Sequence, residues 1–123
     1  MDGLAGEIAA LGRRPLACAG DVTRSSDLRG ISDRVSGKFG RLDLLVNNAG
    51  VEQHALLEAL PEEEFDRLVG VNLKGVFLSL QAFLPLLSRT NDASVVNVAS
   101  AAGLVGMPLA SAYGATKAAV IHL

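Results

Sequence analysis

The sequence predicts an α/β fold with a parallel sheet at its centre, because helical stripes and short apolar runs alternate along the chain. Three short runs are almost wholly apolar without regular alternation, which indicates strands buried on both faces. These runs are Pro15–Ala19, Leu42–Val46 and Val95–Ala99. Helical patterns precede, separate and follow them, and this order builds a parallel sheet through right-handed crossovers.

The first helix and strand are predicted at the start of the chain. An apolar stripe at helical spacing consists of Leu4, Ile8 and Leu11. Gly12 is well placed just past the end of this helix. The run Pro15–Ala19 then forms a buried strand, since proline is tolerated at the first position of a strand, and Asp21 marks its carboxyl end.

A second helix is predicted between the first two strands, with Ser25 or Ser26 as its cap and Gly40 at its end. Its apolar stripe consists of Leu28, Ile31, Val35 and Phe39. A single stripe of this kind is what a helix needs to pack on one face of a sheet. The strand Leu42–Val46 follows it directly.

The longest helix is predicted to begin after Pro61, because proline followed by three acids is typical of a first helical turn. Its apolar face consists of Phe65, Leu68, Val69, Leu73, Val76, Phe77, Leu80, Leu84 and Leu87. Pro85 should bend or shorten its last turns, and Asn72 is a polar residue on the apolar face. A glycine-containing loop over 100–108 and a last helix from Ala112 complete the order.

The composition excludes several classes of function. Half of the 123 residues are hydrophobic and the formal net charge is −2, so neither nucleic acid nor a membrane is an expected partner. Cys18, the single cysteine, excludes an internal disulfide, suits a reducing compartment and is expected in the core. His54 and His122 have no ligand neighbours at metal spacing, so no metal site is expected and neither is given a role. We expect a cytoplasmic protein that binds a small molecule.

Three residues near the end of the chain carry the strongest chemical signal. Tyr113 and Lys117 stand four apart in an alanine-rich segment, so a helix would place both on one face about one turn apart. An ammonium beside a phenol favours the phenolate, which allows Tyr113 to act as a general acid or base. Ser100 lies where a strand ends, and the carboxyl ends of parallel strands are where open sheets bind ligands. The simpler alternative to a catalytic role is that tyrosine and lysine at this spacing belong to a solvated helix face.

Together with two further motifs, these residues resemble the short-chain dehydrogenase/reductase family. Residues 47–50 read Asn-Asn-Ala-Gly after a strand, and residues 71–75 read Val-Asn-Leu-Lys-Gly. The resemblance runs from about Leu4 to the last residue and points to the short, single-domain branch. It implies a partial Rossmann-like, doubly wound parallel sheet with strands 3, 4 and 5 of the family fold. It also implies hydride transfer between NAD or NADP and a small alcohol or carbonyl substrate.

The resemblance assigns roles to individual residues. The implied catalytic residues are Asn72, Ser100, Tyr113 and Lys117. The implied cofactor-binding residues are Asp21, Val22, Asn48, Ala49, Gly50, Tyr113 and Lys117. Ser100 would orient the substrate oxygen, Tyr113 would move the proton, and Lys117 would lower the tyrosine pKa and hold the nicotinamide ribose. Asn72, at a bend in its helix, would hold a water that links the lysine to solvent.

Some of these residues also have a simpler explanation. Asn72 can be a buried amide satisfied by neighbouring groups, while Asp21 and the motif at 47–50 can be ordinary turn residues. The family's glycine-rich turn, which receives the pyrophosphate, and its last strands have no counterpart in residues 1–123. We therefore expect a single partial NAD(P)-binding domain over 1–123. The alternative function is a catalytically inactive fragment or a non-enzymatic interaction protein, and the intact form is expected to be a homodimer or homotetramer.

Overall fold

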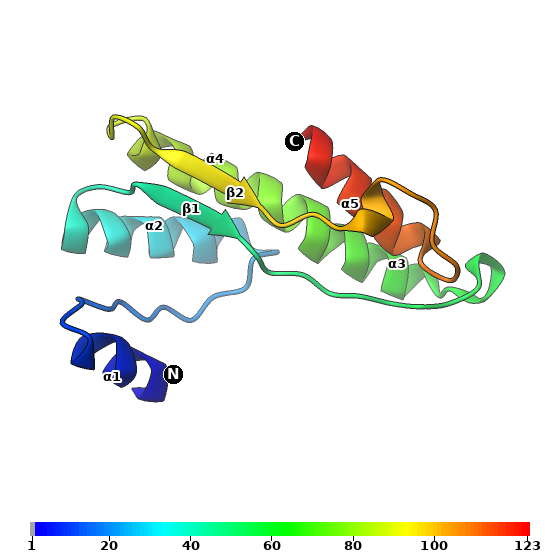
Figure 1. Ribbon diagram of the computed structural model, residues 1–123, viewed down its shortest axis with the longest axis horizontal. Coiled ribbons are helices and arrows are strands. Elements are labelled where there is room, and N and C mark those ends of the chain that lie inside the picture. The colour runs from blue at the N-terminus through cyan, green and yellow to red at the C-terminus, as the bar shows by residue number, and fades with distance from the viewer. Residues whose placement is uncertain (1) are drawn as a thin grey trace.

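The computed structural model describes residues 2–123 and has helices packed on a short sheet (Figure 1). The α-helices are α1 (Asp2–Ala10), α2 (Ser25–Phe39), α3 (Glu62–Leu68), α4 (Gly75–Leu87) and α5 (Ser111–His122). The strands are β1 (Leu44–Asn47) and β2 (Ser94–Asn97). The shorter helical turns are η1 (Leu57–Ala59), the π-helical η2 (Val69–Lys74) and η3 (Ala101–Gly103).

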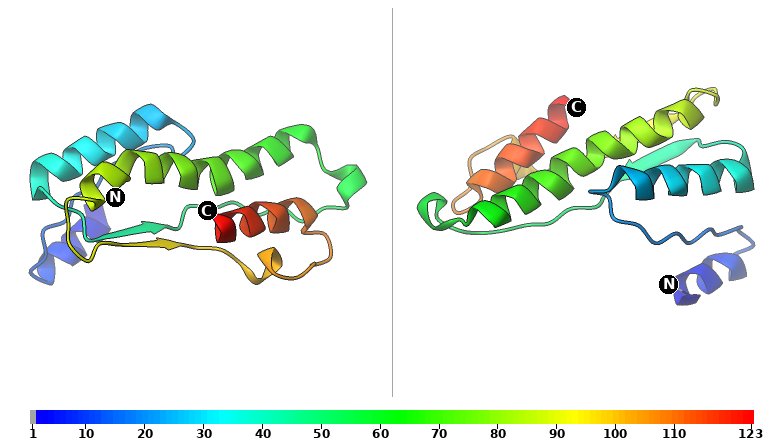
Figure 2. Two further views of the ribbon diagram at one scale, coloured as in Figure 1. Left: turned by 90° about the horizontal axis from the view of Figure 1, so that it is seen from above. Right: turned by 180° about the vertical axis from the view of Figure 1, so that it is seen from behind.

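The sheet consists of β1 and β2, which pair in parallel with Asn47 opposite Asn97. Helices α2 and α4 lie together on one face of this sheet (Figure 2). Between these elements a core cluster of Leu28, Phe83 and Leu87 packs against half-buried residues that include Leu45. The predicted parallel α/β arrangement is confirmed, because β1 and β2 pair in parallel and a long helix lies between them in the sequence. A parallel pair needs a crossover connection of this kind.

The predicted strand at Pro15–Ala19 is wrong, because this segment is extended but joins no strand ladder. A strand needs a neighbour to receive its backbone N–H and C=O groups, and no strand among residues 2–123 lies beside it. Two of its carbonyls instead accept from side chains of α2, Pro15 O from Lys38 Nζ at 2.7 Å and Ala17 O from Arg34 at 3.4 Å. Cys18, expected in the core, is only half-buried.

Glycines end the first two helices as predicted. Gly12 has φ +73° and Gly40 has φ +72°, both in the left-handed region that other residues rarely adopt. Gly40 N–H donates to Ser36 O at 2.8 Å and so satisfies a carbonyl in the last turn of α2. The predicted serine cap at the other end of α2 is wrong, because Arg24 holds the capping position without a side-chain bond.

The long helix predicted after Pro61 is confirmed as the continuous run α3–η2–α4. Its π-helical middle contains Asn72, so the bend that the family resemblance implies at this residue is present. Pro85 lies inside α4, which ends two residues later. By length and composition this run of 26 residues, with a mean hydropathy of 1.4 in its most apolar window, could also cross a membrane. A core helix passes the same test, and this helix packs against both α2 and α5.

Helix α1 lies apart from the other helices, at the end of the extended segment that leads to α2 (Figure 1). Its predicted apolar stripe is largely exposed, with Leu4 at 65% and Leu11 at 78% of full exposure. The helical period therefore predicted the helix correctly, while the stripe is covered only in part: Leu4 and Ile8 line a cavity together with the extended segment 15–18.

Candidate active site

Helix α5 carries Tyr113 and Lys117 on one face, one turn apart. Lys117 is buried, and its Nζ donates a hydrogen bond to Val98 O, just past β2, at 2.7 Å. The same Nζ lies 5.9 Å from the centre of the Tyr113 ring, so the ammonium and the phenol are close without a direct bond. Burial lowers the pKa of Lys117 below its usual 10.5, because the charged form loses hydration.

Asn72 is a buried amide that ties three parts of the site together. Its Oδ1 accepts from Val51 N at 2.8 Å, and its Nδ2 donates to Val51 O at 2.9 Å and to Thr116 Oγ1 at 3.1 Å. Both Nδ2 hydrogens are therefore used by protein groups, which supports the simpler explanation of this residue. One acceptor position remains on Oδ1.

Gly50 marks the point where Asn72 and Lys117 approach each other. A Cβ placed on Gly50 would lie 3.5 Å from Asn72 Oδ1 and 3.6 Å from Lys117 Nζ. The absence of a side chain at residue 50 therefore leaves a small space that faces both polar atoms. A water molecule in such a space would have an acceptor on one side and a donor on the other.

Ser100 begins the turn η3, and its Oγ accepts a hydrogen bond from Ala102 N at 3.2 Å. Two glycines allow η3 to lie directly against α5. A Cβ on Gly114 would lie 2.6 Å from Ala102 O, and a Cβ on Gly103 would lie 2.7 Å from Ala118 N. This close backbone contact fixes the turn that carries Ser100 against the helix that carries Tyr113.

A cavity of about 220 Å³ opens between the ends of the two strands and α5. Its lining consists of Asn48, Gly50, Val51, Glu52, Val98, Ala99, Tyr113 and Lys117. We refer to it as the tyrosine cavity. The structure thus brings four predicted site residues, Asn48, Gly50, Tyr113 and Lys117, to one space, while Ser100 is not among the residues that line it.

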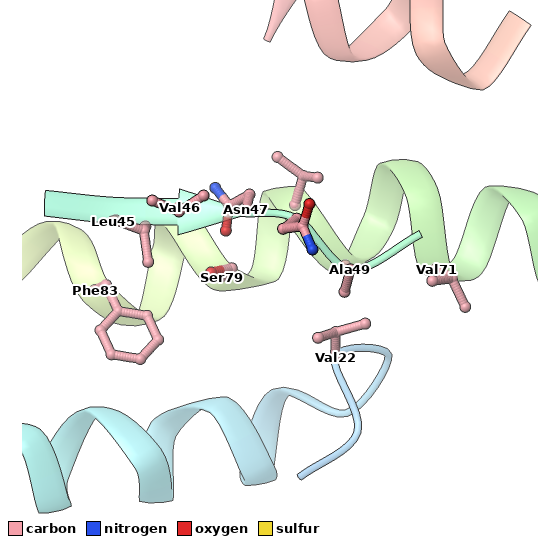
Figure 3. A pocket seen from close by; sticks show the side chains of 11 residues that line it. Val22, Leu45, Val46, Asn47, Ala49, Val71, Ser79 and Phe83 are labelled. Atoms are coloured by element: carbon pink, nitrogen blue, oxygen red, sulfur yellow. The ribbon is translucent and has the colours of Figure 1, made fainter. Parts of the chain in front are cut away.

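A second cavity, of a similar 200 Å³, lies beside β1 on the face that α4 covers (Figure 3). Val22, Asn48 and Ala49 line it together with Val71 and side chains of β1 and α4. Asn48, at the carboxyl end of β1, borders both cavities, and we refer to the two cavities together as the track. Val22, Asn48 and Ala49, three predicted cofactor residues, line the second cavity.

Asp21 is exposed and stabilises the turn before α2. Its Oδ1 accepts from Thr23 N and from Thr23 Oγ1, both at 2.8 Å. These two bonds, the backbone one first, lower the pKa of Asp21, and the charge of Arg24 adds to the effect. The turn places the next residue, Val22, against Gly75, where an added Cβ would lie 3.0 Å from the Val22 side chain.

Sequence reasoning missed two residues of the site. Thr116 is buried, accepts from Asn72 and donates to Tyr113 O at 2.7 Å, and its place one residue before Lys117 was the available signal. Glu52 lines the tyrosine cavity, and no pattern around it pointed there. Within residues 2–123, no three of the His, Cys, Asp and Glu side chains come close enough together to hold a metal ion.

Comparison with known proteins places this geometry in a family. Short chain dehydrogenases match the chain over residues 1–123. The 3-oxoacyl-acyl-carrier-protein reductase FabG of Thermotoga maritima is 41% identical over 103 residues, which are 84% of this chain and 42% of that protein. The chain therefore spans less than half the length of this relative.

Solved structures agree with this result. A short chain dehydrogenase/reductase from Burkholderia phymatum in complex with NAD superposes with a TM-score of 0.93 at 30% identity, covering 98% of this chain and 43% of that one. ElxO with NADP bound gives a TM-score of 0.80 at 35% identity, covering 84% and 42%. The chain therefore belongs to the short chain dehydrogenase family.

Proposed function

We propose that the protein is an NAD(P)-dependent oxidoreductase that interconverts a small alcohol and its carbonyl compound. The observation that carries this proposal is the tyrosine cavity, where Tyr113 and the buried Lys117 share one wall. The related structures named above hold NAD and NADP, which supports the choice of cofactor. When bound, the nicotinamide would supply or accept the hydride.

Tyr113 moves the proton in this proposal. Its hydroxyl gives a proton to the carbonyl oxygen during reduction and takes it back during oxidation. Lys117, whose Nζ lies 5.9 Å from the phenol ring, stabilises the phenolate by its charge. One of its three donors is engaged by Val98 O, which leaves donors for the ribose hydroxyls of the cofactor. Ser100 does not line the cavity but directly follows Ala99, which does, and in this proposal it donates to the same substrate oxygen.

The track across the end of β1 fits an elongated dinucleotide. Its floor is made of small residues, Asn48, Ala49 and Gly50, all exposed at the carboxyl end of the strand. Val22 borders the cavity at one end of this track, and Lys117 borders the cavity at the other. Asp21, next to Val22, accepts from the adenine amino group in this proposal. The pyrophosphate would need further backbone donors, because the track itself offers no helix amino end.

Asn72 serves as a positioning residue in a proton relay. A water in the space left by Gly50 would join Asn72 Oδ1 to Lys117 Nζ and so connect the site to solvent. This extends the simpler explanation of Asn72, because its two donor hydrogens hold Val51 and Thr116 while its Oδ1 keeps a free acceptor position.

The long helix and α5 are proposed to join two copies of the protein, in a cytoplasmic homodimer or homotetramer. Large apolar side chains on these helices are half-exposed, including Phe77 at 49%, Leu84 at 52% and Ile121 at 44%. A second copy related by a two-fold axis would cover them with the same surface. A monomer in light scattering at micromolar concentration would contradict this assembly.

A catalytically inactive fragment or a non-enzymatic interaction protein is the second candidate. The observation that favours it is the exposed apolar stripe of α1, with Leu4 and Leu11 largely uncovered. Assays therefore use the purified protein and, in parallel, a hybrid in which residues 1–123 replace the matching segment of the Thermotoga maritima reductase. Activity in the hybrid alone would support the second candidate for the isolated chain.

Replacing Tyr113 by Phe tests the catalytic assignment. The change removes the proton donor and keeps the ring, so we expect turnover to fall by roughly 100-fold or more while NAD(P) binding stays within about twofold. Turnover of a panel of ketones is followed by the absorbance of the reduced nicotinamide. Ala115→Ser is the control, because Ala115 is an exposed residue of α5 that does not line the tyrosine cavity. A Tyr113→Phe protein that keeps most of its rate would contradict the proposal.

A further inference from the structure

The residue Glu52 gives the tyrosine cavity a charge that the proposed reaction does not use. The cavity lining contains two ionisable cation or carboxylate groups, Lys117 and Glu52. Lys117 is buried with its Nζ turned to Val98 O, whereas the Glu52 side chain is 57% exposed. The accessible charge of the cavity is therefore negative.

The segment that carries Glu52 is held at both ends. On one side, Val51 exchanges two hydrogen bonds with the Asn72 amide, at 2.8 and 2.9 Å. On the other side, Ala55 N donates to Leu109 O at 2.9 Å, across to the loop that follows η3. Leu109 makes this contact with φ +61°, a left-handed conformation that leucine rarely adopts. Glu52 thus lies on a three-residue bridge between two fixed points.

The orientation of the carboxylate is set by His54. His54 Nε2 lies 2.5 Å from Glu52 Oε1, and because an ionised carboxylate only accepts, Nε2 carries the hydrogen. Among the described residues, this is the one side-chain partner that the structure gives Glu52, so Oε2 keeps its acceptor capacity. This hydrogen bond holds the side chain in place.

The opposite wall of the cavity offers one charged group, Lys117, and that group is buried. From Ala93 to Thr116 the sequence contains no Asp, Glu, Lys, Arg or His. That stretch contains β2, η3, the loop after it and the first half of α5, including Tyr113. Apart from Lys117, whose Nζ is buried and bonded to Val98 O, a substrate in the cavity therefore meets apolar and neutral groups on one side and Glu52 on the other.

From this arrangement we infer that Glu52 selects the substrate. Resting on the proposed function, the inference is that the preferred carbonyl compound carries a hydrogen-bond donor, a hydroxyl or an ammonium, near the reacting carbon. Carboxylate Oε2 accepts from that donor and repels a substrate carboxylate. The reaction itself is unchanged: hydride adds to the carbonyl carbon, the π electrons move to oxygen, and oxygen takes the Tyr113 proton.

Three ketones of the form CH3–CO–CH2–X test this inference in the purified protein and the hybrid. Hydroxyacetone is neutral, aminoacetone is a cation and acetoacetate is an anion, and all three share the methyl ketone. We expect kcat/KM to fall in the order cation, neutral, anion. Glu52→Gln should change the cation-to-anion ratio by roughly tenfold, mainly through KM, and added salt should weaken the difference.

Glu58→Gln is the matched control, because it makes the same change of charge at an exposed residue outside the cavity lining. It should leave the order of the three ketones unchanged. If the ketones are turned over but Glu52→Gln leaves their ratio unchanged, the inference is overturned while the proposed function stands. If neither protein reduces any ketone in a wider panel, the proposed function fails and the inference falls with it.

Discussion

The regions around α5 and α1 differ in how firmly they are bonded to the rest of the molecule. Around α5, buried side chains link separate elements through hydrogen bonds: Asn72 of η2 bonds the loop at Val51 and helix α5, and Lys117 reaches across to the end of β2. Around α1, the connecting segment is held to the rest by two side chains of α2, Lys38 and Arg34, that bond exposed carbonyls. Both regions contain a regular helix. The difference shows that a helical period predicts a helix, whereas tertiary partners decide how firmly it is held.

The largest expected difference between the two regions is in amide hydrogen exchange of the isolated chain. Helix α5 is packed on η2 and η3 and contains buried residues such as Thr116 and Val120, whereas α1 exposes its apolar stripe. Amides of α5 should therefore exchange roughly 100-fold more slowly than those of α1, because local opening costs little where few contacts are lost. Mass spectrometry of peptic peptides measures this. Equal protection in both helices would mean that α1 has a partner that its exposure does not reveal.

A second test concerns the close packing that makes the α5 region firm. A Cβ on Gly103 would lie 2.7 Å from Ala118 N, so Gly103→Ala must shift backbone and should cost about 1–3 kcal/mol of unfolding free energy. Gly106→Ala, in the loop that follows η3, is the matched control, because an added Cβ there meets nothing within 4 Å, and it should change stability by less than about 0.5 kcal/mol. Urea unfolding of the hybrid measures both, and similar midpoints for the two variants would refute the packing argument.

This packing also shows what a sequence can and cannot predict. Local periods and residue types predict the helices, both paired strands and the glycine ends of the first two helices. The distortion near Asn72 was expected from the family resemblance. The strand predicted at 15–19 failed because a strand depends on a neighbour as well as on its own apolar character. The serine cap of α2 failed because two adjacent serines fit the pattern and neither bonds the backbone.

The candidate site divides in the same way. The spacing of Tyr113 and Lys117 predicts a shared face, which the structure places on one cavity. Other features of the site depend on residues that lie far apart in the sequence. They are the burial of Lys117, the two hydrogen bonds between Asn72 and Val51, and the position of Glu52 in the cavity. Such pairings arise only when the elements pack, so no local pattern contains them.

A smaller effect is expected from Gly50→Ala, which tests the proposed relay. The new methyl would stand 3.5 Å from Asn72 Oδ1 and 3.6 Å from Lys117 Nζ, which are ordinary contacts, so stability should hold within about 0.5 kcal/mol. The methyl would, however, fill the space proposed for a water. We expect kcat to fall by roughly tenfold with KM for the dinucleotide unchanged. Gly70→Ala, whose Cβ would meet the Thr23 side chain at 3.9 Å, is the control.

The outcome that contradicts the relay is specific. If Gly50→Ala raises KM for the dinucleotide and leaves kcat alone, the methyl obstructs the cofactor track and the relay is not supported. If stability falls by several kcal/mol, the added carbon has disturbed packing, and Asn72 is explained by its structural bonds alone.

The smallest expected effect is the pH dependence that buried Lys117 confers on stability. Burial lowers its pKa below 10.5, so between that lowered value and 10.5 the folded protein has lost the proton that the unfolded chain still holds. Because the unfolded state then binds more protons, the free energy of unfolding rises with pH across this window. Relative to Lys117→Met, the hybrid should therefore gain stability as the pH approaches 10.5. Lys74→Met, at an exposed lysine of η2, controls for the lost positive charge. Urea unfolding at several pH values measures the difference, and a difference that falls with pH would show that Lys117 is stabilised by its charge in the fold and not strained by burial.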